Sequence, residues 1–235
     1  MKPGPPVPHC KHCDRIAAAI MTLLLLAAIA LILTTCAPQS AHAADRAAKV
    51  RVPDVSPLYR LQIEHDAARF FGLRAEPARM AAQIHQESGW NPRAQSPYAM
   101  GLTQFTPSTA KWLPDVCPEV GPPDVWNPRW SISAQHCYMA WLFHRADPIR
   151  AKPMTTCDRW AFALRAYNGG EGWLRREREA SARGGSNPNA WREVEGFRSR
   201  ARWAHKENTE YPQRILLRIE PAYLAAGWPG GPACS

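Results

Sequence analysis

The sequence predicts a mainly α-helical domain behind an N-terminal signal or membrane-anchor segment. Several segments carry apolar residues three or four positions apart, the spacing of one face of an α-helix, whereas no segment longer than a few residues alternates apolar and polar side chains as a strand does. Hydrophobic residues make up 46% of the 235 positions, so the chain can form a core and is not a disordered protein. The 23 prolines and 10 tryptophans argue against a coiled coil and a multi-span membrane protein.

Residues 1–43 have the features of an export signal. The uncharged run 16–33 follows a short segment with three basic residues and one acidic residue, a pattern that inserts with its amino end in the cytoplasm. The run is at the border between a long signal core and a short membrane span, so three outcomes stay open: cleavage after Ala41-His42-Ala43, retention as an inner-membrane anchor, or lipidation at Cys36. We expect the remainder of the chain in the periplasm or cell envelope.

The cysteines divide into two groups. Cys10 and Cys13 have the spacing of half a zinc site, but no second pair of ligands lies nearby, so we expect neither a metal nor another cofactor. Four cysteines follow the cleavage region, and an even number in an exported chain favours two disulfides. The sequence leaves three pairings open for these residues: Cys117, Cys137, Cys157 and Cys234.

The first half of the domain begins after a polar linker at residues 44–55. Ser56 and Pro57 have the residue types of a helix N-cap and first turn, and Gly72 has the type that ends a helix, so we expect a helix between them. A second helix is expected over 77–88, where Gly89 ends it. Residues 90–106 contain prolines and small polar residues and are expected to form a loop.

The second half continues the helical pattern. We expect helices over 107–113, 130–146, 157–167, 170–183 and 210–226, with a long irregular connection at 115–128. The result is one helical domain over 56–228, followed by a short tail at 229–235.

Three short motifs occur in order along this domain. They are Glu87-Ser88-x-x-Asn91-Pro92, Gly101-Leu102-x-Gln104-x-x-Pro107 and Ala166-Tyr167-Asn168-x-Gly170. In this respect the chain resembles the SLT-type, goose-lysozyme-like (family 1) lytic transglycosylases, which cleave the glycan strands of peptidoglycan. The resemblance spans about residues 58–217 and implies a lysozyme-like helical fold.

Glu87 is the candidate for acid catalysis. It lies at the end of a helix beside apolar residues, where burial raises the pKa of a carboxyl group and keeps it protonated near neutral pH. The resemblance implies that this carboxyl protonates the glycosidic oxygen between MurNAc and GlcNAc and then removes a proton from the C6 hydroxyl of the same sugar, which attacks C1 and leaves a 1,6-anhydro end. It also implies that Ser96, Gln104, Tyr167, Asn168 and Tyr211 bind the substrate. For Tyr211, a packed core position is an equal alternative, because a tyrosine on an amphipathic helix is usually buried.

Two other functions stay open. A lysozyme-type hydrolase generally needs a second carboxylate, and residues 88–114 contain neither Asp nor Glu, although a distant acid can fold back into the site. A glycan-binding module without turnover, part of a secretion, conjugation or phage machine, has no need of a buried acid such as Glu87. The same active site serves wall remodelling, hole-making and lysis, so the biological role does not follow from the motifs.

The chain is basic, with 29 Lys and Arg residues against 20 Asp and Glu residues. Much of this excess lies in residues 174–206, where a solvated surface is the simplest interpretation, and attraction to the anionic wall polymer or membrane surface is an alternative. No nucleic-acid motif is present and export separates the domain from nucleic acid, so we expect peptidoglycan and not nucleic acid as the partner. Aromatic residues near the motifs are candidates to line a saccharide groove or to pack in the core: Trp90, Tyr98, Phe105 and Trp112.

Overall fold

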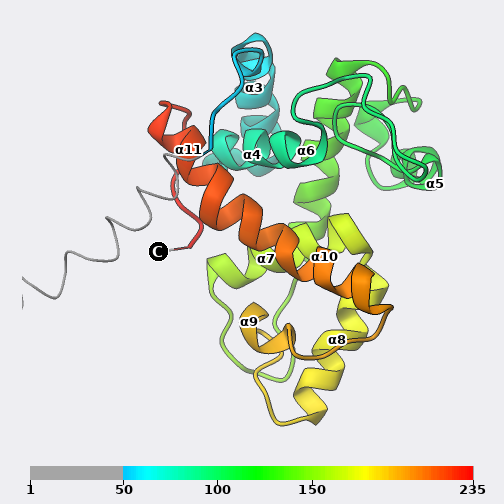
Figure 1. The fold of residues 1–235 in the computed structure, drawn as a ribbon, viewed down its shortest axis with the longest axis vertical. Coiled ribbons are helices and arrows are strands. Elements are labelled where there is room, and N and C mark those ends of the chain that lie inside the picture. The colour runs from blue at the N-terminus through cyan, green and yellow to red at the C-terminus, as the bar shows by residue number, and fades with distance from the viewer. Residues whose placement is uncertain (1–49, 235) are drawn as a thin grey trace, which may run out of the picture. The chain divides into compact units, whose positions relative to one another are not determined.

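The computed structural model describes residues 50–234 (Figure 1). In this range the protein is helical, and the only β-type pairs are two isolated bridges, Gln95 with Met100 and Met100 with Phe105. The prediction of a mainly α domain is therefore confirmed. The candidate anchor 16–33, the cleavage site, Cys36 and the Cys10–Cys13 pair lie outside the described residues. Over residues 50–234, no helix has the length and apolar character that crossing a membrane requires.

The elements follow one another with short connections. In chain order they are η1 (Ser56–Tyr59), α3 (Arg60–Phe71), η2 (Gly72–Arg74), α4 (Pro77–Ser88), α5 (Pro107–Trp112), η3 (Leu113–Asp115), η4 (Pro118–Val120), α6 (Pro128–Arg145), α7 (Thr156–Gly169), α8 (Glu171–Arg183), α9 (Trp191–Val194), α10 (Arg202–Arg214), η5 (Ile215–Ile219) and α11 (Glu220–Ala225). The η elements are 3-10 turns, except η5, which is a π-helical segment.

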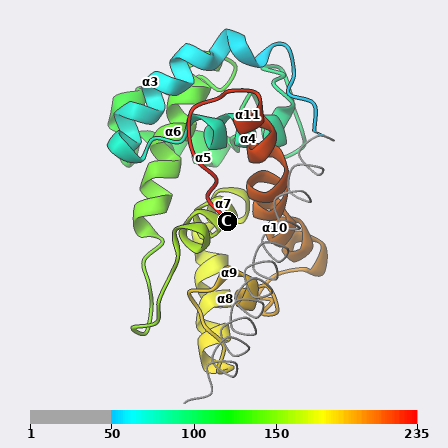
Figure 2. The same cartoon turned by 90° about the vertical axis from the view of Figure 1, so that its left-hand side faces the viewer.

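Helices α3, α4 and α6 form one end of the domain, and α8 and α9 form the other (Figures 1 and 2). Helix α7 lies between these ends and packs against α6, α8 and α10. The helical run from α10 through η5 to α11 passes from α7 to α4, so it joins both ends (Figure 1). The core between them contains fully buried apolar side chains from most helices, including Ile63, Ile84, Ile132, Phe162 and Ile215.

Local sequence explains where the helices that carry the site begin and end. Pro77 occupies the first turn of α4, where a missing N–H breaks no helical bond, and Gly89 ends the helix in the left-handed conformation with φ of 58°. The side chain of Thr155 accepts a hydrogen bond from the backbone N–H of Asp158, whose carboxylate accepts one from the N–H of Thr155. This capping box fixes the start of α7.

The structure corrects two helix starts. The helix expected from Glu210 begins at Arg202, because its first two turns bury polar groups instead of an apolar stripe. His205 contacts the carboxylate of Glu177, and Asn208 donates to the backbone oxygen of Arg165. Ser56 is buried in a 3-10 turn and its side chain caps nothing, so the first regular helix begins at Arg60.

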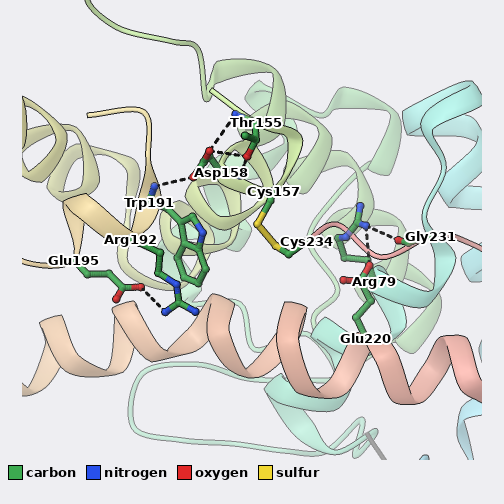
Figure 3. Close-up of a disulfide and its surroundings, with 10 residues drawn as sticks. All are labelled: Arg79, Thr155, Cys157, Asp158, Trp191, Arg192, Glu195, Glu220, Gly231 and Cys234. Carbon is green, nitrogen blue, oxygen red and sulfur yellow. Dashed lines mark hydrogen bonds and ion pairs between the residues drawn. A yellow bond between two sulfur atoms is a disulfide. The ribbon is translucent and has the colours of Figure 1, made fainter. Parts of the chain in front are cut away.

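Two disulfides connect the four cysteines, as the even number predicts. Cys117 pairs with Cys137, and Cys157 pairs with Cys234. The second bond attaches the C-terminal residues to the start of α7 (Figure 3). Beside it, the guanidinium of Arg79 donates to the backbone oxygen of Gly231 and forms an ion pair of 2.7 Å with Glu220. The tail is therefore fastened to the domain.

The basic stretch 174–206 is partly internal. Arg178 is buried and donates to backbone oxygens and to Asn189. Glu177, also buried, pairs with Arg165 at 2.5 Å and with Arg200 at 3.3 Å. Two arginines of this region, Arg178 and Arg200, are therefore used in internal contacts of α8 with neighbouring loops and with the end of α7, and the positive surface is smaller than the residue count indicates.

Candidate active site

All six residues that the motifs single out line one cavity of about 390 Å³. Glu87 comes from the end of α4, Tyr167 and Asn168 from the end of α7, and Tyr211 from α10, while the loop between α4 and α5 supplies Ser96 and Gln104. Segments up to 124 positions apart therefore meet in one place. The fold therefore brings together side chains that lie far apart in the sequence.

Glu87 lies in the wall of this cavity, partly buried. Its Oε1 atom accepts a short hydrogen bond from the hydroxyl of Tyr211. Tyr211 is only 2% exposed, so it is a core residue and a cavity residue at once. Its hydroxyl therefore contacts the acid directly.

The surroundings of Glu87 favour its protonated form. Desolvation by burial is the largest influence and raises the pKa of Glu87 from 4.5 to about 8, whereas the hydrogen bond from Tyr211 acts in the opposite direction. The negative charge of Glu207 raises the pKa further, and the positive charge of Arg214 lowers it. A carboxyl group with such a pKa holds its proton at neutral pH, as a general acid requires.

The loop that follows α4 is held by its own polar side chains. The Ser96 hydroxyl accepts hydrogen bonds from the N–H groups of Tyr98 and Ala99 at 3.2 and 3.0 Å. The Gln104 amide donates to the backbone oxygens of Ala94 and Gly101 at 3.1 and 2.8 Å. Both side chains line the cavity, and their hydrogen bonds to the backbone shape the loop.

Gly101 is required for this loop to close. Its φ is 78°, and a Cβ atom there would lie 1.9 Å from the backbone oxygen of Val125. A larger residue therefore meets both backbone strain and a direct clash. This is the physical reason for a glycine at the start of the second motif.

The third motif places two polar side chains in the wall of the cavity. The hydroxyl of Tyr167 donates to the backbone oxygen of Thr103 at 2.8 Å, which joins α7 to the loop. Burial and the neighbouring Glu87 carboxyl raise the pKa of Tyr167 well above its ordinary value, so it stays neutral. Asn168 accepts a hydrogen bond from Asn208 at 3.1 Å. The amide NH₂ group of Asn168 takes no part in this bond and can donate to other groups.

The candidate aromatic liners have different locations. Tyr98 is 75% exposed and lines the cavity, as does the buried Phe105. Trp90 is a core residue with φ of 70°, and its indole N–H donates to the hydroxyl of Tyr223 at 2.6 Å. Trp112 contacts Tyr138 edge-on and is not among the lining residues of the cavity.

Sequence reasoning missed several lining residues, of which Glu207 matters most. It lies on α10 one turn before Tyr211 and places a second carboxyl group at the cavity. Glu207 lies outside the acid-free segment 88–114. It also precedes the helix that the sequence predicts, which was expected to begin only at Glu210. The other missed lining residues are Gln86, Ala99, Thr106, Thr109 and Tyr138.

A larger cavity of about 710 Å³ lies between α6, α7 and α8, and none of the motif's chemically active side chains lines it. Its lining combines buried apolar residues, among them Leu142, Phe162 and Leu174, with five arginines. Within residues 50–234, no cluster of three or more His, Cys, Asp or Glu side chains has a geometry that could hold a metal ion. The smaller cavity with Glu87 is therefore the candidate active site.

Comparison with known proteins agrees with this geometry. Residues 73–189 match the model of the transglycosylase SLT domain. The chain contains a transglycosylase SLT domain. The matched segment contains Glu87 and all three motifs, whereas Glu207 and Tyr211 follow it in the chain.

Several curated proteins resemble this SLT chain. It is 34% identical over 164 residues to the membrane-bound lytic murein transglycosylase F of Thiobacillus denitrificans, covering 61% of the chain and 32% of that protein. It is 37% identical over 116 residues to the protein of the same name from Desulfosudis oleivorans, covering 49% of the chain and 23% of that protein. The chain thus spans a third or less of the length of these relatives.

Proposed function

We propose that this protein is a peptidoglycan lytic transglycosylase that cleaves the bond between MurNAc and GlcNAc, with Glu87 as its single acid and base. The observation that carries the proposal is the partly buried carboxyl of Glu87, with its raised pKa, in a cavity lined by all three SLT motifs. The names of the relatives, which are lytic murein transglycosylases, point to the same substrate.

The proposed reaction uses one carboxyl group twice, first as an acid and then as a base. Glu87 donates its proton to the glycosidic oxygen as the bond to C1 of MurNAc breaks, and GlcNAc leaves with a free hydroxyl. The carboxylate then accepts the proton of the C6 hydroxyl on the same MurNAc, whose oxygen bonds to C1 and closes a 1,6-anhydro ring. Glu87 returns to its protonated form and no water is consumed. An intramolecular nucleophile has an effective molarity of about 10⁵ M or more, which removes the need for a second catalytic carboxyl.

The lining residues divide into two kinds in this proposal. Asn168 and the exposed Tyr98 are available to contact sugar, through an amide and an aromatic face. Tyr211 acts through Glu87 and holds its carboxyl in place. The Ser96 and Gln104 side chains bind substrate with the hydrogen-bonding capacity that remains after they hold the loop.

The second carboxyl at the cavity favours one alternative, hydrolysis. Glu207 is exposed and lies on the cavity wall, where it can act as the base that activates a water molecule. In a hydrolase its loss abolishes turnover, whereas in a transglycosylase Glu207 mainly tunes the acidity of Glu87. The two functions therefore differ in their products and in their need for Glu207.

Mass spectrometry of purified peptidoglycan after digestion separates these functions. Muropeptides one water lighter than reducing-end products, lost with Glu87→Gln and kept with Glu207→Gln, support the transglycosylase. Reducing ends that disappear with Glu207→Gln support the hydrolase. A matched control is Glu210→Gln, one turn along the exposed side of α10 and outside the cavity. If the wild type binds peptidoglycan and releases no glycan product, the protein is a binding module.

The location of the protein is part of the same proposal. A substrate in the cell wall requires that the domain lies in the periplasm or envelope, held there by the anchor at residues 16–33 if this segment is retained. Fractionation with an antibody against the domain tests this: recovery from the cytoplasm contradicts the proposal.

A further inference from the structure

Two fully buried glutamines connect Glu87 to the protein interior. Gln83 lies on α4, one turn before Glu87, and Gln135 lies on α6. The amide nitrogen of Gln135 is 2.9 Å from Oε1 of Gln83, and the amide nitrogen of Gln83 is 3.2 Å from the hydroxyl of Tyr211. The chain of hydrogen bonds ends at Oε1 of Glu87.

The direction of this chain follows from a backbone carbonyl. The side-chain amide of Gln135 lies 3.2 Å from the backbone oxygen of Met80, which can only accept, so the NH₂ group of Gln135 is on this side. The same NH₂ group donates to Gln83, so Gln83 presents its oxygen to Gln135 and its own NH₂ group to Tyr211. Because the oxygen of Tyr211 accepts from Gln83, its proton is directed to Glu87.

The contribution of these two buried amides to stability does not explain their presence. Oε1 of Gln135 is buried and accepts no hydrogen bond from residues 50–234, and a buried polar atom without a partner is destabilising. Apolar side chains of similar volume would fill the same space between α4, α6 and α10 without that penalty. The arrangement therefore points to a role in the site.

We propose that Gln83 and Gln135 are positioning residues that fix the Tyr211 hydroxyl as a donor to Oε1 of Glu87, so that the acid proton resides on Oε2. This deepens the proposed function and rests on it, since it assigns a role in presenting the proton of Glu87. Oε1 is occupied by a permanent donor, which leaves one oxygen to exchange the proton with substrate. The relay is defined by four residues, Gln135, Gln83, Tyr211 and Glu87.

Four charged or titratable side chains face Glu87. Glu207, Arg214 and Tyr211 come from α10, and Tyr167 comes from α7. Gln83→Met leaves all of these groups in place. It removes the amide donor and the amide acceptor of Gln83 at nearly constant side-chain volume. Tyr211 then donates more weakly to Glu87, so the carboxylate is less stabilised and its pKa rises.

The experiment compares Gln83→Met with Gln213→Met, a glutamine on α10 that binds Glu195 and lies outside the cavity. We expect kcat on purified peptidoglycan to fall roughly tenfold in Gln83→Met with a smaller change in KM, and the alkaline limb of the pH profile to move to higher pH. Carbon-13 NMR of the Glu87 carboxyl should show the same rise of its titration midpoint. Gln213→Met should change neither quantity.

A double-mutant cycle tests whether the glutamines act through Tyr211. In a Tyr211→Phe background, Gln83→Met should produce no further change in kcat or in the titration of Glu87. An equal effect in both backgrounds, or an unchanged Glu87 midpoint in the single variant, overturns the relay. If Gln83→Met does not fold, Gln135→Met interrupts the same chain one residue earlier, and the same outcomes apply to it.

The NMR readout separates this inference from the proposed function. If the titration midpoint of Glu87 is higher in Gln83→Met than in the wild type, and the wild type makes no glycan products, the hydrogen-bond relay is supported and the transglycosylase is contradicted. An unchanged midpoint in a wild type that makes anhydro products contradicts the relay and leaves the transglycosylase in place.

Discussion

The hydroxyl of Tyr211 donates a hydrogen bond to Glu87 across 124 positions of sequence. This bond joins the end of α4 to the last turn of α10, the two helices that carry both carboxyl groups of the cavity. Burial raises the pKa of Tyr211 well above its ordinary value, so the phenol stays neutral and remains a donor. The acid of the proposed reaction thus has a fixed orientation before substrate binds.

Replacement of Tyr211 by Phe removes this donor and keeps the ring in the core. Because the bond lowers the pKa of Glu87, its loss should raise that pKa above about 8. We also expect kcat to fall by roughly 10- to 100-fold, since the carboxyl group is no longer held in place. The measurement is a pH profile of kcat with the Glu87 midpoint from NMR; a midpoint that falls would mean that the phenol acts on Glu87 in another way.

Glu87→Gln should stabilise the protein, most strongly at high pH. The unfolded state releases the Glu87 proton near pH 4.5, whereas the folded state keeps it up to about pH 8. Between these values the folded state binds more protons, so stability falls as pH rises. Removing the group should therefore increase the free energy of unfolding by about 4 kcal/mol at pH 8 and by little at pH 4. Urea unfolding at both pH values checks this, and an equal gain at the two pH values would contradict it.

The predictable part of the molecule is local. Helix α4 and the loop after it follow from Pro77, Gly89 and the prolines beyond, because caps and breakers act within a few residues. The even count of cysteines predicted two disulfides, but their pairing depends on which helices meet, and spacing alone carries no such information.

The rest of the site depends on long-range packing. Glu207 was missed because the first turns of α10 bury polar residues, so apolar periodicity does not mark them. Trp90 looked like a possible groove aromatic from its place beside Glu87, but its left-handed backbone turns the indole into the core against Tyr223. Gln83 has no marker in the sequence at all, since its role depends on Gln135 and Tyr211 from other helices.

Gly101→Ala should destabilise the domain and disturb the cavity. The new Cβ would lie 1.9 Å from the backbone oxygen of Val125, and φ is 78°, so we expect a loss of roughly 3 kcal/mol. Gly89→Ala is the control: its φ of 58° and ψ of 30° lie in the left-handed helical region, but nothing lies within 4 Å of the added atom, so only about 1 kcal/mol of strain is expected. Thermal and urea unfolding of both variants test this. Similar losses in the two would show that the contact with Val125 relaxes freely.

The two disulfides should differ in their contribution to stability. Cys157 and Cys234 close a loop with a sequence separation of 77, and Cys117 and Cys137 close one of 20. The loss of chain entropy in the unfolded state predicts about 4.5 kcal/mol for the long loop and about 3 kcal/mol for the short one. The Cys157→Ser/Cys234→Ser variant should therefore unfold at lower urea than Cys117→Ser/Cys137→Ser, and it also frees the tail that binds Arg79 through Gly231. The reverse order would show that packing around the buried Cys117 outweighs loop length.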